Sequence, residues 1–147
     1  MKNVKLYNVI FPFWMLLLFP VTWLVVLPAN FIVDTVVLLL SMYVLKIADK
    51  KQWWKKCILK IFSIGIFSDL LGSAYMFALM MIFEVGRMGD ELYITLPAIF
   101  ISAVLIFVLN YFISFKKFDK PLRIKLSLIF AIVTAPYTFL IPTSWMY

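Results

Sequence analysis

The feature that most constrains this chain is an almost wholly apolar run from Val9 to Leu45, followed by further apolar stretches of similar length. Crossing the hydrocarbon core of a bilayer, roughly 30 Å thick, takes about 20 helical residues. Hydrophobic residues make up 65% of the 147 positions, and the mean hydropathy is +1.05. A soluble chain of this length could not hide so much apolar surface. The sequence therefore predicts an all-α integral membrane protein.

Five transmembrane helices are expected, within a single domain over residues 1–147. Backbone polar groups cannot stay unpaired in lipid, and the alternating pattern of barrel strands is absent. A break is expected at residues 27–30, because Pro28 is typical of the first turn of a helix. A re-entrant loop over residues 7–45 remains an alternative. The expected helices cover 7–26, 29–45, 61–83, 93–115 and 126–141, with basic loops at 46–60 and 116–125.

The basic residues fall on one side of this arrangement. Thirteen of the fourteen precede the first expected helix or lie in the two basic loops, and only Arg87 lies in the opposite loop. Positively charged loops stay in the cytoplasm, which predicts a cytoplasmic N-terminus and an external C-terminus. Lysine is used far more than arginine, which suggests a bacterial source. The expected location is therefore the bacterial cytoplasmic (inner) membrane.

The expected loop over residues 46–60 has apolar side chains at helical spacing, with lysines largely on the other side. Trp53 and Trp54 in this loop are typical of anchors at the headgroup level. One interpretation is a helix lying on the anionic cytoplasmic leaflet. The favoured interpretation is a topology and anchoring signal with no specific lipid or nucleic-acid partner. Membrane orientation alone accounts for the net charge of +7.

Two short sequences recur and raise the question of an internal repeat. "LPANFI" from Leu27 and "LPAIFI" from Leu96 are 69 residues apart, and "ADK" from Ala48 and "FDK" from Phe118 are 70 apart. A duplication would give one leading helix and two helical hairpins of the same orientation, a pattern seen in transporters. Chance matching between apolar segments is the alternative.

The residue inventory excludes several kinds of chemistry. The chain has no histidine and a single cysteine, Cys57, for which an inert thiol is expected. Disulfides, His-based metal clusters and Cys-His or Ser-His nucleophile systems therefore have no basis. No glycine-rich phosphate loop occurs either. We expect no metal, no cofactor and no enzymatic activity.

Asp34 and Asp69 are the only acidic residues within the expected helices. Small residues on one helix face let a neighbouring helix approach closely, so both polar faces should turn towards protein. Asn30 and Asp34 share a face of the expected second helix. The stripe around Asp69 consists of Gly65, Ser68, Asp69, Gly72 and Ser73.

A carboxyl group within the bilayer costs roughly 2.5 to 3.5 kcal/mol on insertion scales. Such a group is protonated, holds a cation or lines a water-filled cavity; the structural alternative is a neutral, hydrogen-bonded group that fixes helix contacts. Helical rise from the expected helix ends places Asp34 about 8 Å below the outer boundary and Asp69 about 12 Å above the inner one. The expected offset is some 10 Å. Carboxylates at different depths in the membrane favour successive binding positions along an ion path.

The leading hypothesis is a small transporter or an ion- or proton-conducting subunit, in a homo-oligomer or with a membrane partner subunit. The alternative is a non-transporting subunit, or an immunity or assembly protein, that binds a partner protein. An intramembrane aspartyl protease is disfavoured, because its two carboxylates must lie at one level. The candidate path residues are Asp34, Asp69, Asn30, Ser68, Asn110 and Thr134, with Ser114, Tyr137 and Thr138 as further polar groups.

Overall fold

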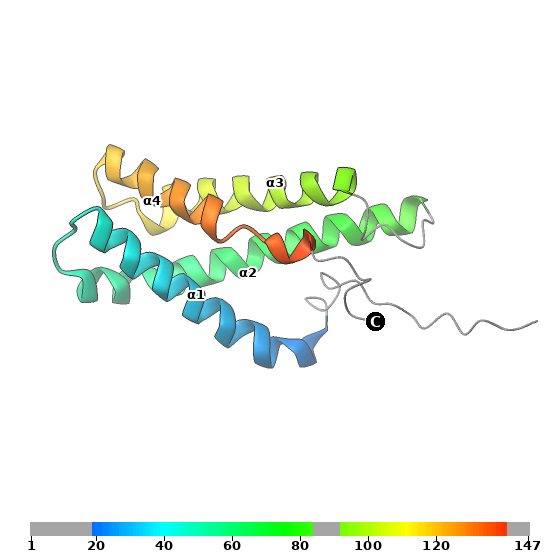
Figure 1. Ribbon diagram of the computed structural model, residues 1–147, viewed down its shortest axis with the longest axis horizontal. Coiled ribbons are helices and arrows are strands. Elements are labelled where there is room, and N and C mark those ends of the chain that lie inside the picture. The colour runs from blue at the N-terminus through cyan, green and yellow to red at the C-terminus, as the bar shows by residue number, and fades with distance from the viewer. Residues whose placement is uncertain (1–18, 84–91, 141–147) are drawn as a thin grey trace, which may run out of the picture.

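The computed structural model describes residues 19–83 and 92–140, and within these ranges every regular element is helical (Figure 1). The all-helical class expected from the sequence is therefore confirmed for the described residues. The elements are η2 (Pro20–Thr22), α1 (Trp23–Val44), α2 (Lys50–Phe83), α3 (Leu92–Leu109), the π-helical η4 (Asn110–Ser114), α4 (Lys120–Val133) and η5 (Tyr137–Leu140).

Three helical segments are long and apolar enough to cross a membrane: Pro20–Val44, Lys50–Leu79 and Ile94–Ser114. Large apolar side chains cover their outer surfaces; Leu24 is 80% exposed and Phe100 is 70% exposed. In water each Å² of such surface would cost about 25 cal/mol, and lipid removes that cost. The structure therefore supports a membrane location.

The helices form two antiparallel hairpins, α1 with α2 and α3 with α4, whose short connections lie at the same end of the molecule (Figure 1). α2 packs against both α1 and α3, and α4 packs against α3. One buried cluster lies between the hairpins and includes Leu38, Met42, Ile61, Phe115 and Phe130. A second cluster joins α2, α3 and η5 around Met76, Ala98 and Phe139.

The expected break at residues 27–30 is wrong, because Pro28 lies inside α1 as its sixth residue. Proline removes one backbone hydrogen bond here, the one from its own nitrogen to Leu24, whereas a full break would leave several polar groups facing lipid. The expected helix over 7–26 contributes only its last residues to α1, and residues 7–18 lie outside the described part of the chain.

The basic loops expected at 46–60 and 116–125 are also wrong over most of their length. α2 begins at Lys50 and α4 at Lys120, so most of the basic residues lie on helical turns. The apolar face of the first stretch packs into the protein, because Ile58 and Ile61 are buried in the first cluster. A helix with one apolar face buries it against whatever apolar surface lies nearest, and here that surface is protein.

The two tryptophans expected as interfacial anchors contact other side chains. The Trp53 ring lies 4.2 Å from the Phe118 ring, measured between centroids. The Trp54 indole N–H donates to Thr35 Oγ1 at 3.3 Å, which ties the first turns of α2 to α1. Both rings are half-buried. They brace the connection end of the molecule.

The expected helix over 126–141 is wrong in its second half, because the segment is broken near Pro136. α4 ends at Val133 instead of continuing to residue 141, and Thr134 Oγ1 donates back to the Phe130 carbonyl at 2.7 Å. The residue before a proline disfavours the helical region, so the helix stops just short of it. The chain then continues into η5.

The positions that suggested a repeat occupy matching places in the two hairpins. Pro28 and Pro97 are each the sixth residue of their helix, in α1 and α3 respectively. Asp49 and Asp119 each come directly before the second helix of a hairpin, α2 or α4. These matches agree with a duplication, which itself stays a prediction.

Candidate functional site: a pair of carboxylates between α1 and α2

Asp34 is buried where α1 faces α2, with 6% of its surface exposed. A Cβ placed on Gly65 of α2 would lie 3.7 Å from Asp34 Oδ2, an ordinary van der Waals distance. The carboxylate therefore lies against a stretch of α2 backbone that carries no side chain. The two helices meet here through a glycine on one side and an acidic group on the other.

Asp69 lies one helical turn beyond Gly65 on the same face of α2, because residues four apart are neighbours on a helix surface. Its Oδ1 is buried and has no hydrogen-bond partner within residues 19–83 and 92–140. Because Asp34 lies against Gly65, the two carboxylates are about one helical turn apart along this face of α2. We call Asp34, Gly65, Ser68 and Asp69 the paired-carboxylate site.

The expected separation of the two carboxylates in depth is wrong. The contact with Gly65 puts Asp34 about one turn, or roughly 6 Å, from Asp69, on the side nearer the connections. α1 begins at Trp23 instead of residue 29, which moves Asp34 about 9 Å deeper than the expected helix start implied. α1 also crosses α2 at an angle (Figure 1). The two aspartates form one site instead of two separate stations.

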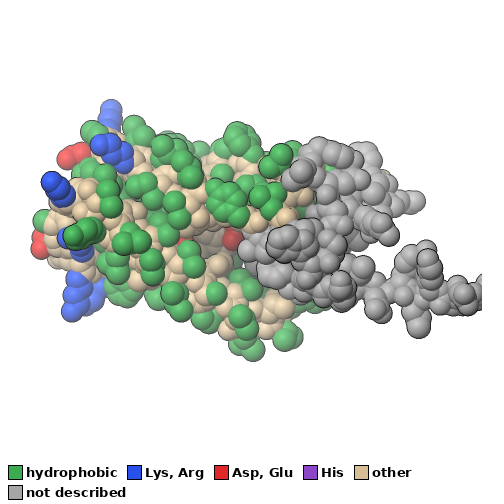
Figure 2. All heavy atoms as spheres, viewed as in Figure 1, with side chains coloured by type: hydrophobic (Ala, Val, Ile, Leu, Met, Phe, Trp, Pro, Cys, Tyr) green, Lys and Arg blue, Asp and Glu red, His purple; other side chains and the backbone are tan. Residues whose placement is uncertain are grey.

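Positive charge lies away from this site. Figure 2 shows the Lys and Arg side chains gathered at one end of the described part of the molecule, while acidic atoms also appear in a hollow near its middle. Asp34 and Asp69 are the acidic residues of the described helices away from the basic end. No Lys or Arg occurs between Phe19 and Leu45, or in the described residues between Ile61 and Phe115. The site has no countercharge from these segments.

Ser68 adds a second unsatisfied group beside Asp69. Its side chain is fully buried, and its Oγ has no hydrogen-bond partner among the described residues. Its backbone carbonyl accepts a hydrogen bond of 3.0 Å from Ser102 Oγ of α3. An unpaired buried hydroxyl costs free energy, about 1–3 kcal/mol. Two buried oxygens at adjacent positions of α2, Ser68 Oγ and Asp69 Oδ1, therefore have unused hydrogen-bonding capacity among the described residues.

Gly72 and Ser73, predicted to mediate helix packing, lie where α2 meets α3. A Cβ on Gly72 would overlap the Ser102 hydroxyl and lie 3.0 Å from Phe139 Cε2. Ser73 is fully buried. The polar stripe of α2 thus serves two purposes: its Gly72 end admits a neighbouring helix, and its Gly65 end admits a carboxylate.

Within the described residues, no hydrogen bond joins the other predicted path residues to Asp34 or Asp69. Asn110 and Ser114 are buried in η4, where Ser114 Oγ donates to Asn110 Oδ1 at 2.7 Å. Thr134 is bonded to its own helix. Asn30 is half-buried on α1. Tyr137 donates to the Ile132 carbonyl, and the side chain of Thr138 lies outside the description.

Sequence analysis overlooked two buried serines. Ser102 is fully buried and donates to the Ser68 carbonyl. The sequence does contain a pattern that predicts a buried Ser102, because Ala98 and Ser102 form a small-xxx-small pair on α3. Ser127 of α4 is also fully buried, and its Oγ has no partner in the described residues. No sequence pattern marked Ser127.

Comparison of the chain with protein-family models, with curated proteins and with solved structures found no match in any of the three.

Proposed function

We propose that this protein is a small membrane transporter or ion-conducting subunit whose paired-carboxylate site binds a proton or a small monovalent cation. The observation that carries the proposal is the buried Oδ1 of Asp69 beside Asp34, which has no hydrogen-bond partner among the described residues. No Lys or Arg occurs between Phe19 and Leu45, or in the described residues between Ile61 and Phe115. Ionisable groups inside a membrane are costly and mark ion or proton pathways. A bound cation or a shared proton would supply the missing partner.

The proposed orientation follows from the distribution of charge. The connections at residues 45–49 and 115–119 lie at the basic end of the molecule (Figure 2). The positive-inside rule places that end in the cytoplasm of a bacterial cell, with the C-terminus outside. Two hairpins of the same orientation, α1 with α2 and α3 with α4, complete the proposed topology. A homo-oligomer or a partner subunit would enclose the path more fully than this chain alone.

Flux through proteoliposomes tests the proposed function. Wild-type protein should conduct protons, sodium or potassium down an imposed gradient, and Asp34→Asn and Asp69→Asn should each reduce the flux to that of protein-free liposomes. Asn preserves shape but cannot carry the charge that a passing cation needs. Asp119→Asn is the matched control, because Asp119 is exposed at the start of α4, and its flux should equal wild type.

Circular dichroism of each variant establishes that its helices are intact. A wild-type protein that passes none of the three ions would overturn the proposal, as would full flux in both Asn variants. In the second case the partner-binding alternative gains support, because its essential residues should lie on exposed surfaces.

One observation favours a second candidate, an intramembrane aspartyl protease. Two carboxylates that share a proton or a water must lie near each other, and the approach of Asp34 to Gly65 reduces their separation along α2 from the expected 10 Å to roughly 6 Å. A protease would require both carboxylates for peptide cleavage in detergent and would show no ion flux.

A further inference from the structure

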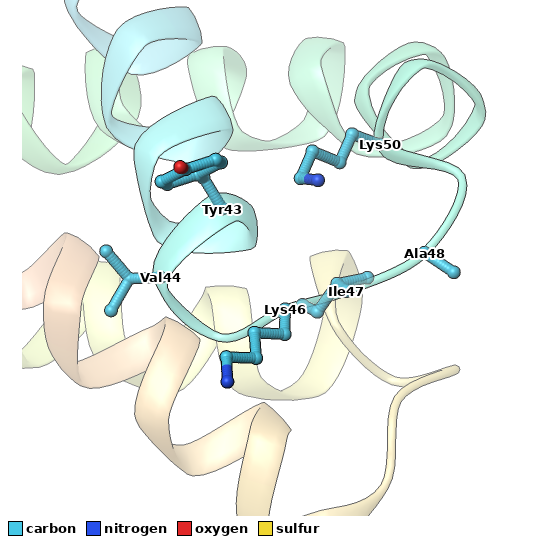
Figure 3. Close-up of a pocket in the computed structure, with 6 residues that line it drawn as sticks. All are labelled: Tyr43, Val44, Lys46, Ile47, Ala48 and Lys50. Carbon is cyan, nitrogen blue, oxygen red and sulfur yellow. The ribbon is translucent and has the colours of Figure 1, made fainter.

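A cavity of about 550 Å³ lies at the connection between α1 and α2, at the basic end of the molecule. It is formed by the last turn of α1, the connecting loop and the first residue of α2 (Figure 3). The residues that line it are Tyr43, Val44, Lys46, Ile47, Ala48 and Lys50. This cavity is far along both helices from the paired-carboxylate site, and nothing proposed above uses it.

The loop that forms the cavity is held in a defined shape. Ile47 is buried, and its N–H donates to the Met42 carbonyl at 2.9 Å. Lys46 and Asp49 have positive φ angles of 53° and 54°, a left-handed conformation that residues other than glycine adopt at some cost. Residues held in such conformations tend to occur where a site must be shaped in advance.

Two ammonium groups border the cavity. Lys50 extends towards the Tyr43 ring, with Nζ 5.6 Å from the ring centroid, while Lys46 lies on the other side of the loop (Figure 3). Lys50 is also the first residue of the long helix α2, whose N-terminal end carries a partial positive charge. Asp49 is the one acidic residue of this loop, and with two lysines beside it the loop stays net positive, which favours an anion at the mouth of the cavity.

The remaining wall of the cavity is apolar and faces outwards. Tyr43 is 72% exposed and Val44 is 71% exposed, both on the last turn of a helix long enough to cross the membrane. Tyrosine at the end of a membrane helix lies at the headgroup level, with lysine side chains reaching towards the headgroups. A free phosphate ion would make no favourable contact with this apolar wall, whereas a phospholipid would place its acyl chain there.

We propose that this cavity binds the phosphate headgroup of an anionic phospholipid from the leaflet at the basic end, with an acyl chain lying along Tyr43 and Val44. Lys50 contacts the headgroup beside Tyr43, and Lys46, on the other side of the loop, adds positive charge at the same membrane surface. Anionic lipids are drawn to lysines near the membrane surface, and basic pockets on the cytoplasmic side bind such headgroups. The proposal requires the membrane location and is independent of ion transport.

The test measures lipid bound to the full-length protein in neutral detergent by native mass spectrometry. Wild-type protein is mixed with phosphatidylglycerol, with phosphatidylcholine, or with phosphatidylglycerol in the presence of excess inorganic phosphate. Wild type should retain phosphatidylglycerol at least tenfold more tightly than phosphatidylcholine, since two lysines near a headgroup contribute about that much or more. Inorganic phosphate should not displace the lipid.

The double variant Lys46→Asn with Lys50→Gln should lose that preference. Asparagine is chosen at position 46 because it tolerates the left-handed conformation, so the loop keeps its shape. The matched control, Lys116→Gln with Lys117→Gln, removes two exposed lysines from the other connection and should keep the preference. If the two double variants lost the preference for phosphatidylglycerol equally, the lipid would be attracted by the basic surface as a whole, and the proposal of a specific site in the cavity would be wrong. If inorganic phosphate displaced the lipid, the cavity would be a site for a free anion, and the proposal that it binds a phospholipid would be wrong.

Discussion

Replacing Gly72 by leucine is expected to prevent α3 and η5 from packing against α2, and so to unfold most of the protein in detergent at room temperature. Even a single added carbon at this position would overlap the Ser102 hydroxyl and lie 3.0 Å from Phe139 Cε2. Adding a methyl group to a packed core costs about 1–3 kcal/mol, and leucine adds three more carbons in the same place. Gly72→Ala should therefore be measurably destabilised, and Gly72→Leu should fail to give a cooperative thermal transition by circular dichroism.

Gly65→Ala is the matched control for this prediction. The added carbon would be 3.7 Å from Asp34 Oδ2, an ordinary contact, and alanine favours the helix by about 1 kcal/mol over glycine. Its melting temperature should equal or exceed that of wild type. In the double variant Gly72→Ala with Ser102→Ala, removal of the hydroxyl should recover part of the loss. Equal stability of Gly72→Ala and Gly65→Ala would contradict the close approach of α3 at Gly72.

Replacing the two aspartates by leucine is expected to stabilise the protein. Asp69 Oδ1 is buried without a hydrogen-bond partner in the described part of the chain, and two ionised carboxylates this close would repel each other. Removing an unpaired buried polar group recovers about 1–3 kcal/mol, so Asp69→Leu should raise the unfolding free energy in detergent by an amount in that range. A functional carboxylate is commonly kept at the expense of stability. The same substitution should leave no site for a cation.

A double-mutant cycle sharpens this second prediction. Because the two carboxylates repel each other, removing either one also relieves the other, and the double variant should gain less than the sum of the single gains. The control is Asp119→Leu, because Asp119 is exposed before α4, has an ordinary extended backbone and makes no side-chain cap hydrogen bond, so its loss should bring no gain. If both leucine variants were destabilised, the aspartates would be acting as hydrogen-bonded supports for helix packing, the structural alternative set out from the sequence.

The helical class and the inward-facing stripe on α2 could be read from the sequence because each depends on local information. Apolar length identifies a membrane helix, and the spacing of Ser68, Asp69 and Gly72 identifies one face. Both follow from helix geometry alone. The stop of α4 before Pro136 also has a local cause, the restriction that proline places on its predecessor, but the expected helix continued to residue 141.

The element boundaries and the carboxylate pair could not be obtained in the same way. Pro28 predicts a helix start because that is its usual place in water, whereas the membrane helix α1 continues through it. The contact between Asp34 and Gly65 depends on where α1 begins and how it crosses α2, and both are set by packing between helices. The start of α1 lies about six residues before the expected position, and this difference alone changes the expected depth of Asp34 by some 9 Å.

Infrared difference spectroscopy of the protein in lipid membranes tests most directly whether the paired-carboxylate site binds a proton or a cation. Spectra are recorded as pH, sodium or potassium is changed. Wild type should show a carboxyl band that responds to at least one of these ions, weaker in Asp34→Asn and in Asp69→Asn, absent in the double variant and unchanged in Asp119→Asn. A wild-type spectrum with no ion-dependent carboxyl band, or the same band in the double variant, would contradict the proposed site.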